Sequence, residues 1–231
     1  MLRLVGYFAL VFVALYVFRH IPVLGELFRI PLLGFIVAAA LVSAGISWYA
    51  VHALDARRAR AMVSRLGAVD TPHNQGKLGS FVLAQGRPRK AIPHLERAVA
   101  GEGESAEWNY RLGCAYLASR RPAEAARVLE ASTRIDPDHA FGAAQLRLSE
   151  ARLRAGAADR ALEAVQRFED ERGANPESAY RRGNALLRLG RKADARAAFT
   201  EVARLAADSA RFQRAQQRSY TLLAFLRRLL T

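Results

Sequence analysis

The sequence has almost no cysteine and lacks the short motifs of common enzyme classes. Cys114 is the one cysteine among 231 residues, so no disulfide can form within the chain. The chain contains no GxxxxGK(S/T) or GxGxxG phosphate loop, no HExxH zinc motif and no GxSxG nucleophile elbow. His73, His94 and His139 stand in separate segments without metal-site spacing. We therefore predict a protein that is not an enzyme and that needs no metal or cofactor.

The chain also lacks a concentrated stripe of positive charge, although it is strongly basic. Lysine and arginine number 35 against 21 acidic residues, which gives a net charge of +14. The excess is spread along the chain, with +6 over residues 72–207 and +4 over residues 208–231. Nucleic-acid binding usually gathers cations on one surface with aromatic residues between them. We therefore do not expect nucleic acid as a partner, and we keep an electrostatic binder of anionic lipid or nucleic acid as a third hypothesis.

Two long runs without charge lie within the first 54 residues. Residues 30–54 would form a helix of about 37 Å, enough to cross a hydrocarbon core of about 30 Å. Residues 4–18 are shorter and span with their flanks, giving a first crossing over about residues 4–20. The following Arg19-His20-Ile21-Pro22 offers no small-x-small cleavage site, so we predict a retained anchor rather than a cleaved signal peptide. Residues 1–54 are thus expected to form a two-helix transmembrane hairpin.

A basic linker over residues 55–71 indicates the orientation of this hairpin. Four arginines follow the second run: Arg57, Arg58, Arg60 and Arg65. The loop between the runs holds Arg19 and Arg29, and arginines near span ends tend to stay in the cytoplasm. We therefore expect a multi-pass protein of a bacterial inner membrane with both ends in the cytoplasm; the arginine-rich, lysine-poor composition is typical of a GC-rich genome. The four arginines could also contact anionic headgroups.

From residue 72 onward the sequence repeats itself in steps of 34, 36 and 34 residues. Three columns carry the repeat: Gly86, Arg120, Gly156 and Gly190; Ala91, Ala125, Ala161 and Ala195; Leu95, Leu129, Val165 and Phe199. A period of this length marks an array whose units bury their apolar faces by stacking on one another. Within a unit, two helix-periodic stretches flank a breaker such as Arg121-Pro122. The pattern predicts a helix-turn-helix unit.

This unit resembles the tetratricopeptide repeat, whose hallmark columns are matched by Leu112, Gly113, Tyr116, Ala125, Leu129 and Pro137. Four copies are expected, over residues 72–105, 106–139, 142–175 and 176–207. The third copy is degenerate, since Ser149 replaces the paired glycine, Arg152 replaces the aromatic, and two extra residues precede it. The resemblance implies an all-α, right-handed solenoid. Residues 208–231 predict a capping helix, with contact to membrane or partner as the alternative.

The resemblance further implies a concave groove, lined by the first helix of each repeat, that binds a peptide or helix of another protein. Counting from the matched glycines gives the expected lining: Lys77, Ser80, Tyr110, Cys114, Leu117, Arg154, Tyr180, Asn184 and Arg188. The same count adds Leu83, Glu150, Leu153 and Leu187. Arg154, Asn184 and Arg188 could hold a carboxylate or a backbone group. Cys114 is interpreted as a small packing residue rather than a reactive thiol.

The leading hypothesis is therefore a membrane-tethered scaffold or adaptor that holds a protein partner, with no small-molecule substrate. An alternative is an extracytoplasmic assembly factor for an envelope or cytochrome complex, which requires the opposite topology of the hairpin. The identity of the partner is left open by the sequence.

Overall fold

The computed structural model describes residues 42–50, 61, 63, 64, 66, 69–208 and 211–229, with side chains from residue 217 onward in the last segment. The chain divides into two compact units, Met1–Arg65 and Leu66–Thr231. Apart from a short helix over residues 42–50, the expected hairpin lies outside the described residues, as do Arg57, Arg58, Arg60 and Arg65. Among the residues that are described, no helix combines the length and hydrophobicity that a membrane crossing requires.

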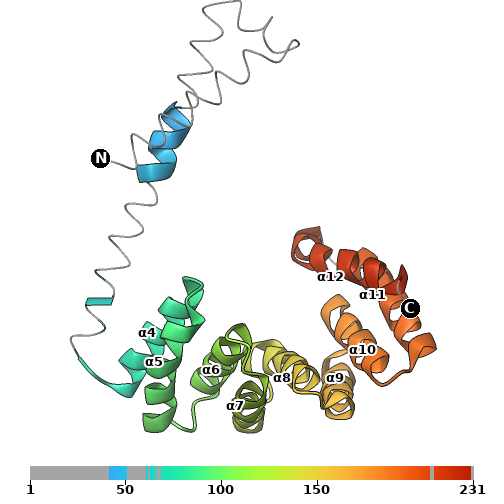
Figure 1. The fold of residues 1–231 in the computed structure, drawn as a ribbon, viewed down its shortest axis with the longest axis horizontal. Coiled ribbons are helices and arrows are strands. Elements are labelled where there is room, and N and C mark those ends of the chain that lie inside the picture. The colour runs from blue at the N-terminus through green and yellow to red at the C-terminus, as the bar shows by residue number, and fades with distance from the viewer. Residues whose placement is uncertain are drawn as a thin grey trace, which may run out of the picture. The chain divides into compact units, whose positions relative to one another are not determined.

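The second unit is an all-helical repeat solenoid, without strands in its described part. Its helices are α4 (Pro72–Ala84), α5 (Pro88–Gly101), α6 (Ala106–Ala118), α7 (Pro122–Ile135), α8 (Ala143–Arg154), α9 (Ala158–Arg172), α10 (Pro176–Arg188), α11 (Lys192–Asp208) and α12 (Arg211–Leu229), with a 3-10 turn η2 (His139–Gly142) before α8. Each odd-numbered helix packs on the even-numbered helices beside it in sequence, and α4, α6, α8, α10 and α12 also contact one another in succession. The row curves, with α6, α8 and α10 on its inner side and α7 and α9 outside (Figure 1).

Local sequence signals explain where several helices begin. Proline occupies the first turn of α4, α5, α7 and α10, where its missing N–H costs nothing. The side chains of Thr71, Ser105 and Asn175 accept a hydrogen bond from a first-turn N–H of α4, α6 and α10. At α10, Asn175 and Ser178 bond reciprocally in a capping box. By contrast, α5, α7 and α9 begin without a side-chain cap.

Glycines allow the two helices of a repeat to cross closely. A Cβ atom added to Gly79 would lie 2.6 Å from Leu95 Cγ, one on Gly113 would lie 2.4 Å from Leu129 Cγ, and one on Gly183 would lie 2.5 Å from Phe199 Cε1. The alanine column and the large-residue column are both buried, at 2% exposure or less: Ala91, Ala125, Ala161, Ala195, Leu95, Leu129, Val165 and Phe199. The predicted small and large columns are thus the contact surface between paired helices.

Repeat 3 (α8 and α9) packs differently at this crossing. Its glycine position holds Ser149, which is buried and donates from Oγ to the carbonyl oxygen of Leu146 at 2.8 Å. The opposing column holds Val165 rather than leucine or phenylalanine, so the smaller partner makes room for a Cβ and a hydroxyl. In repeat 3, the larger residue at the glycine position is therefore matched by a smaller residue in the opposing column.

The two extra residues before α8 are absorbed in η2. Ala140 and Phe141 adopt positive φ values of 52° and 57°, and Gly142 follows with 76°. Phe141 is 90% exposed. The hydrophobic core also divides in this repeat, since Leu148 and Ala151 of α8 join one buried cluster while Ala161 and Leu162 of α9 join the next.

Arg152 keeps the polar contact of the aromatic that it replaces. In repeat 2 (α6 and α7), the Tyr116 hydroxyl donates to Glu96 of α5 at 2.5 Å. In repeat 3, Arg152 Nη2 donates to Glu130 of α7 at 3.0 Å. Both bonds join the first helix of a repeat to the second helix of the preceding repeat at equivalent positions. The substitution therefore exchanges a buried hydroxyl for a guanidinium without losing the link between neighbouring repeats.

Candidate functional site: the concave face

The inner helices carry one cation each at the same repeat position, two residues before the paired glycine or its serine replacement. These residues are Lys77, Arg111, Arg147 and Arg181. Three residues further along each helix lie Ser80, Cys114, Glu150 and Asn184. Because positions three apart share a helix face, each helix presents both columns on one side. The concave face is thus a ladder of cations beside a column of small or polar groups.

Glu150 of α8 is the centre of an ion-pair network on this face. Its carboxylate contacts Arg147 at 3.0 Å, Arg154 at 2.5 Å and Arg181 of α10 at 3.0 Å. Arg181 also pairs with Glu177 at 2.6 Å. Burial alone would raise the pKa of Glu150, but Arg181, Arg154 and Arg147 outweigh burial and lower that pKa. The carboxylate is therefore held ionised by three guanidinium groups, and the network keeps a net positive charge.

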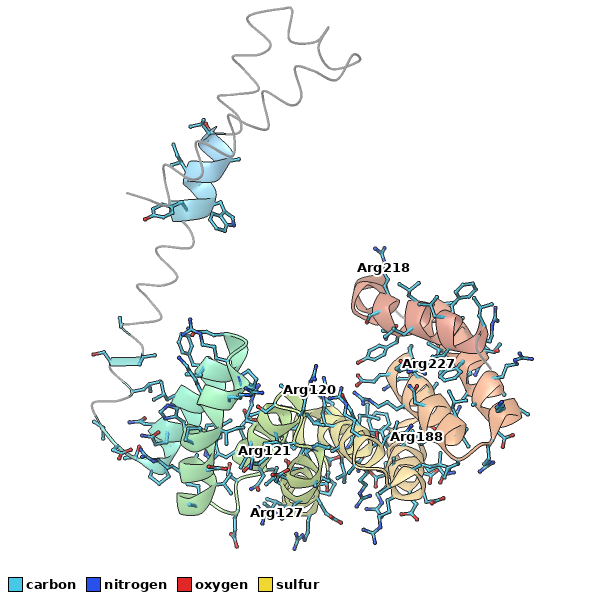
Figure 2. The ribbon with its side chains drawn as sticks, viewed as in Figure 1. Arg120, Arg121, Arg127, Arg188, Arg218 and Arg227 are labelled. Atoms are coloured by element: carbon cyan, nitrogen blue, oxygen red, sulfur yellow. The ribbon has the colours of Figure 1, made fainter. Side chains whose placement is uncertain are left out.

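A cavity of about 390 Å³ opens beside this network between α8, α10 and α12. Its lining includes Arg154, Tyr180 and Asn184, which the sequence predicts, together with Glu150 and Leu153. The last helix contributes Tyr220, Leu223 and Arg227 to the lining. The rings of Tyr180 and Tyr220 lie 5.8 Å apart, and Figure 2 shows Arg227 between α12 and α10. The terminal helix therefore forms one side of the groove.

Tyr110 and Cys114 lie together on α6, beside Arg147 of α8 and outside the lining of this cavity. Burial raises the pKa of the Tyr110 hydroxyl and, as the largest effect, that of the Cys114 thiol. The thiol is thus protonated at neutral pH, in keeping with a packing residue. Leu117 lies differently, because its side chain is 6% exposed and belongs to the hydrophobic core. Only its carbonyl oxygen is used across the groove, accepting from Arg154 Nη1 at 3.3 Å.

The other predicted residues are not part of this cavity. Lys77 is exposed on α4, and the hydroxyl of Ser80 is buried without a hydrogen-bond partner among the described residues. Arg188 is exposed at the end of α10. Within the described part of the chain, no three histidine, cysteine or acidic side chains gather as metal ligands. The structure thus brings together Arg154, Tyr180 and Asn184 from repeats 3 and 4, and it leaves Arg188 and the predicted residues of repeat 1 outside the cavity.

Sequence reasoning missed Arg147 and Arg181, which line the cavity, Glu177, which pairs with Arg181, and the lining residues of α12. A usable signal was present, because lysine or arginine stands two residues before each matched glycine or its replacement. No comparable signal exists for Tyr220 and Leu223, since their contact with α10 arises only when α12 packs beside it.

Comparison with known proteins supports the repeat assignment. Models described as tetratricopeptide repeat match residues 82–148 and residues 146–210, which together span more than half of the chain. The chain is therefore a tetratricopeptide-repeat protein. No sequence among the curated proteins matches it.

Solved structures show the same fold. A crystal structure of MamA aligns with a TM-score of 0.58 and 23% identity, over 65% of this chain and 87% of that one. An MSR-1 MamA structure gives 0.59 and 19%, over 68% and 91%. The TPR-like repeats of a Podosopora anserina protein give 0.56 and 19%, over 65% and 84%. At these identities the similarity concerns the fold alone.

Proposed function

We propose that this protein is a membrane-tethered adaptor that binds an extended peptide or short helix of a partner protein on the concave face between α8, α10 and α12. The observation that carries the proposal is the cavity beside the Glu150 network, which combines aromatic, aliphatic and cationic side chains. Tetratricopeptide repeats generally act as scaffolds for protein partners, and stacked repeats create extended concave binding surfaces.

The cavity suits recognition of a polypeptide more than chemistry on a small molecule. Tyr180, Leu153 and Leu223 offer an apolar surface for one or two partner side chains, while Arg154 and Asn184 lie at its border to bond main-chain or carboxylate oxygens. Asn184 Nδ2 already donates to the carbonyl oxygen of Tyr180 at 2.9 Å, which fixes the orientation of its amide. A polar side chain that is already held in place by such a bond loses less conformational entropy when a partner binds.

Tethering would follow from the two uncharged runs over residues 4–18 and 30–54. A membrane anchor raises the local concentration of a captured partner near other membrane proteins. The arginines after the second run favour a cytoplasmic location for the repeats. Alkaline phosphatase or a fluorescent protein fused after Thr231 reports this orientation. Phosphatase activity without fluorescence would instead support the extracytoplasmic assembly factor.

A photo-crosslinking residue placed in the groove tests the binding site. We expect p-benzoylphenylalanine at Asn184 to form a discrete adduct in intact cells, and the same residue at Glu163, exposed on the outer helix α9, to form none. Adding Tyr180→Ala should reduce the adduct at position 184 by about tenfold, since a buried aromatic anchor carries 1–2 kcal/mol or more. Equal adducts at both positions, or an adduct indifferent to Tyr180→Ala, would show that the groove is not the binding surface.

A further inference from the structure

The fold separates charges that are mixed in the sequence. Because paired helices run antiparallel, the short turns within repeats lie on one edge of the solenoid and the connections between repeats lie on the other. The first turn, residues 85–90, holds three cations and no carboxylate, whereas the first connection, residues 102–107, holds three glutamates and no cation. The next connection begins with Asp136 and Asp138, and its His139 contacts Glu107 at 2.9 Å. In repeats 1 and 2 the turn edge thus carries more cations than carboxylates, and the edge of the connections carries more carboxylates than cations.

A cavity of about 510 Å³ lies on that edge between the α4–α5 and α6–α7 turns. We name it the basic turn pocket and define it by the cations that line it, Arg87, Arg89, Lys90 and Arg120, together with Ser119. No carboxylate is among its lining residues. None of these four cations forms an ion pair with an acidic group in the described part of the chain. Four cations around one cavity repel each other, so an anion bound there would lower their energy.

The neighbouring arginine behaves differently. Arg121 pairs with Glu124 at 3.0 Å, and its guanidinium lies 4.6 Å from the centre of the Tyr116 ring. Figure 2 shows Arg120 and Arg121 leaving the same turn in different directions. The guanidinium of Arg121 is therefore occupied by contacts within the protein. By contrast, Arg120 lines the pocket together with Arg87, Arg89 and Lys90.

Two further observations at this pocket indicate a ligand. The Ser119 hydroxyl is buried and has no hydrogen-bond partner among the described residues. An unsatisfied buried hydroxyl is costly unless something bonds to it. Arg120 has a φ of 62°, while the other three repeats place Gly86, Gly156 and Gly190 at this left-handed position. The chain thus keeps a cation where glycine would be less strained.

We propose that the basic turn pocket binds a phosphate group, through the guanidiniums of Arg87, Arg89 and Arg120, the ammonium of Lys90 and the hydroxyl of Ser119. Planar guanidiniums bond phosphate oxygens in pairs, and the hydroxyl donates a further bond. The adjacent α5 begins without a side-chain cap, so its positive end also favours an anion. The phosphate comes either from a lipid headgroup or from free phosphate. This site is separate from the concave groove and does not depend on partner binding there.

The test uses the full chain in non-ionic detergent. Calorimetric titration with inorganic phosphate reports the free anion. Native mass spectrometry of micelles doped with phosphatidylglycerol or phosphatidylcholine reports bound lipid. The triple variant Arg87→Gln, Arg89→Gln, Lys90→Gln is expected to weaken binding at least tenfold, and Arg120→Gly about threefold, because each change removes charge-assisted hydrogen bonds to the phosphate. Retained phosphatidylglycerol with no response to inorganic phosphate assigns a headgroup as the source, and binding of both assigns the phosphate group itself.

A matched control is available in the α10–α11 turn, where Arg191 already pairs with Asp194 at 2.7 Å and Lys192 follows. The double variant Arg191→Gln, Lys192→Gln removes two positive charges from another turn without touching the pocket, and less than a twofold change in binding is expected. Circular dichroism confirms that each variant is folded. If neither phosphate nor phosphatidylglycerol binds, or if the control variant loses as much binding as the triple variant, the pocket is not a phosphate site. The same holds if the triple variant binds as the unchanged protein does.

Discussion

In repeat 2, the first helix crosses the second at Gly113 against Leu129, whereas in repeat 3 the same crossing sets Ser149 against Val165. The link to the preceding repeat differs in parallel, through the Tyr116 hydroxyl in one and the Arg152 guanidinium in the other. In both places the partner side chain accommodates the change. The difference teaches that repeat columns constrain pairs of residues rather than single positions, so a repeat that departs from the pattern can still stack.

The hydrophobic core of the solenoid is divided into two clusters, and the division falls within repeat 3. Buried residues of α5, α6, α7 and α8 form one cluster, and those of α9, α10, α11 and α12 form another. The conspicuous polar groups of repeat 3, Ser149 and Gln145, are buried at this division. We infer that repeat 3 joins two hydrophobic blocks, of which the second includes the helix that walls the groove.

Transplanting the serine into repeat 2 should give the largest effect. Gly113→Ser places a Cβ 2.4 Å from Leu129 Cγ and is expected to lower the free energy of unfolding by about 2 kcal/mol, since overpacking costs 1–3 kcal/mol. Leu129→Val alone should cost about 1 kcal/mol. The double variant, which copies the Ser–Val pair, should be more stable than the sum of the single changes predicts, as measured by urea unfolding of the full chain in detergent. If the losses of the two single variants simply add in the double variant, the two positions do not compensate each other.

Removing the hydroxyl of Tyr116 should cost about 1 kcal/mol at neutral pH, because the bond to Glu96 is lost. Burial and the Glu96 carboxylate raise the pKa of Tyr116 to about 12, above the unfolded value of about 10. The folded protein therefore holds this proton more tightly, and the resulting stability is present below pH 10 and is lost as the pH rises toward 12.

Unfolding of the unchanged protein and of Tyr116→Phe between pH 8 and pH 12 measures this effect. The unchanged protein should lose about 1–2 kcal/mol relative to the variant across that range. Parallel pH curves for the two proteins would show that Tyr116 does not titrate as expected.

At the turn between the two helices of a repeat, repeat 2 and not repeat 3 departs from the pattern. Repeat 3 has the usual glycine, Gly156, whereas repeat 2 has Arg120. Gly156→Arg should destabilise the protein by about 1 kcal/mol, because φ is +88° and the space around a Cβ is open, so the cost is conformational. Arg120→Gly should stabilise it by somewhat less, as measured by thermal unfolding. Opposite signs for the two changes are the expected result, and a loss of stability in Arg120→Gly would show that its side chain supports the fold.

Much of the solenoid follows from the sequence because its packing is local and periodic. The alanine and large-residue columns recur at fixed steps, and every member is buried. The departures at Ser149 and Arg152 are also visible in the sequence, but the role of Val165 and Glu130 opposite them follows only from how the helices pack.

The groove was less predictable, because it depends on how the repeats stack. Leu117 stands at the repeat position of Leu153, which lines the cavity, yet Leu117 is buried in the hydrophobic core. Tyr220 reaches the cavity only through the packing of α12 on α10. The basic turn pocket is formed by two turns that are 34 residues apart in the sequence. A count of charge along the chain therefore does not reveal that their cations lie together.

The smallest expected effect concerns the link made by Arg152. Glu130 is largely exposed, and such ion pairs usually contribute less than about 1 kcal/mol, so Glu130→Gln should cost about 0.5 kcal/mol and less at high salt. Tyr116→Phe removes the equivalent bond in repeat 2, but from a buried hydroxyl, and its cost should not depend on salt. Urea unfolding at low and high sodium chloride separates the two. A salt-independent cost for Glu130→Gln would mean that Arg152 joins repeat 3 to repeat 2 through packing rather than through charge.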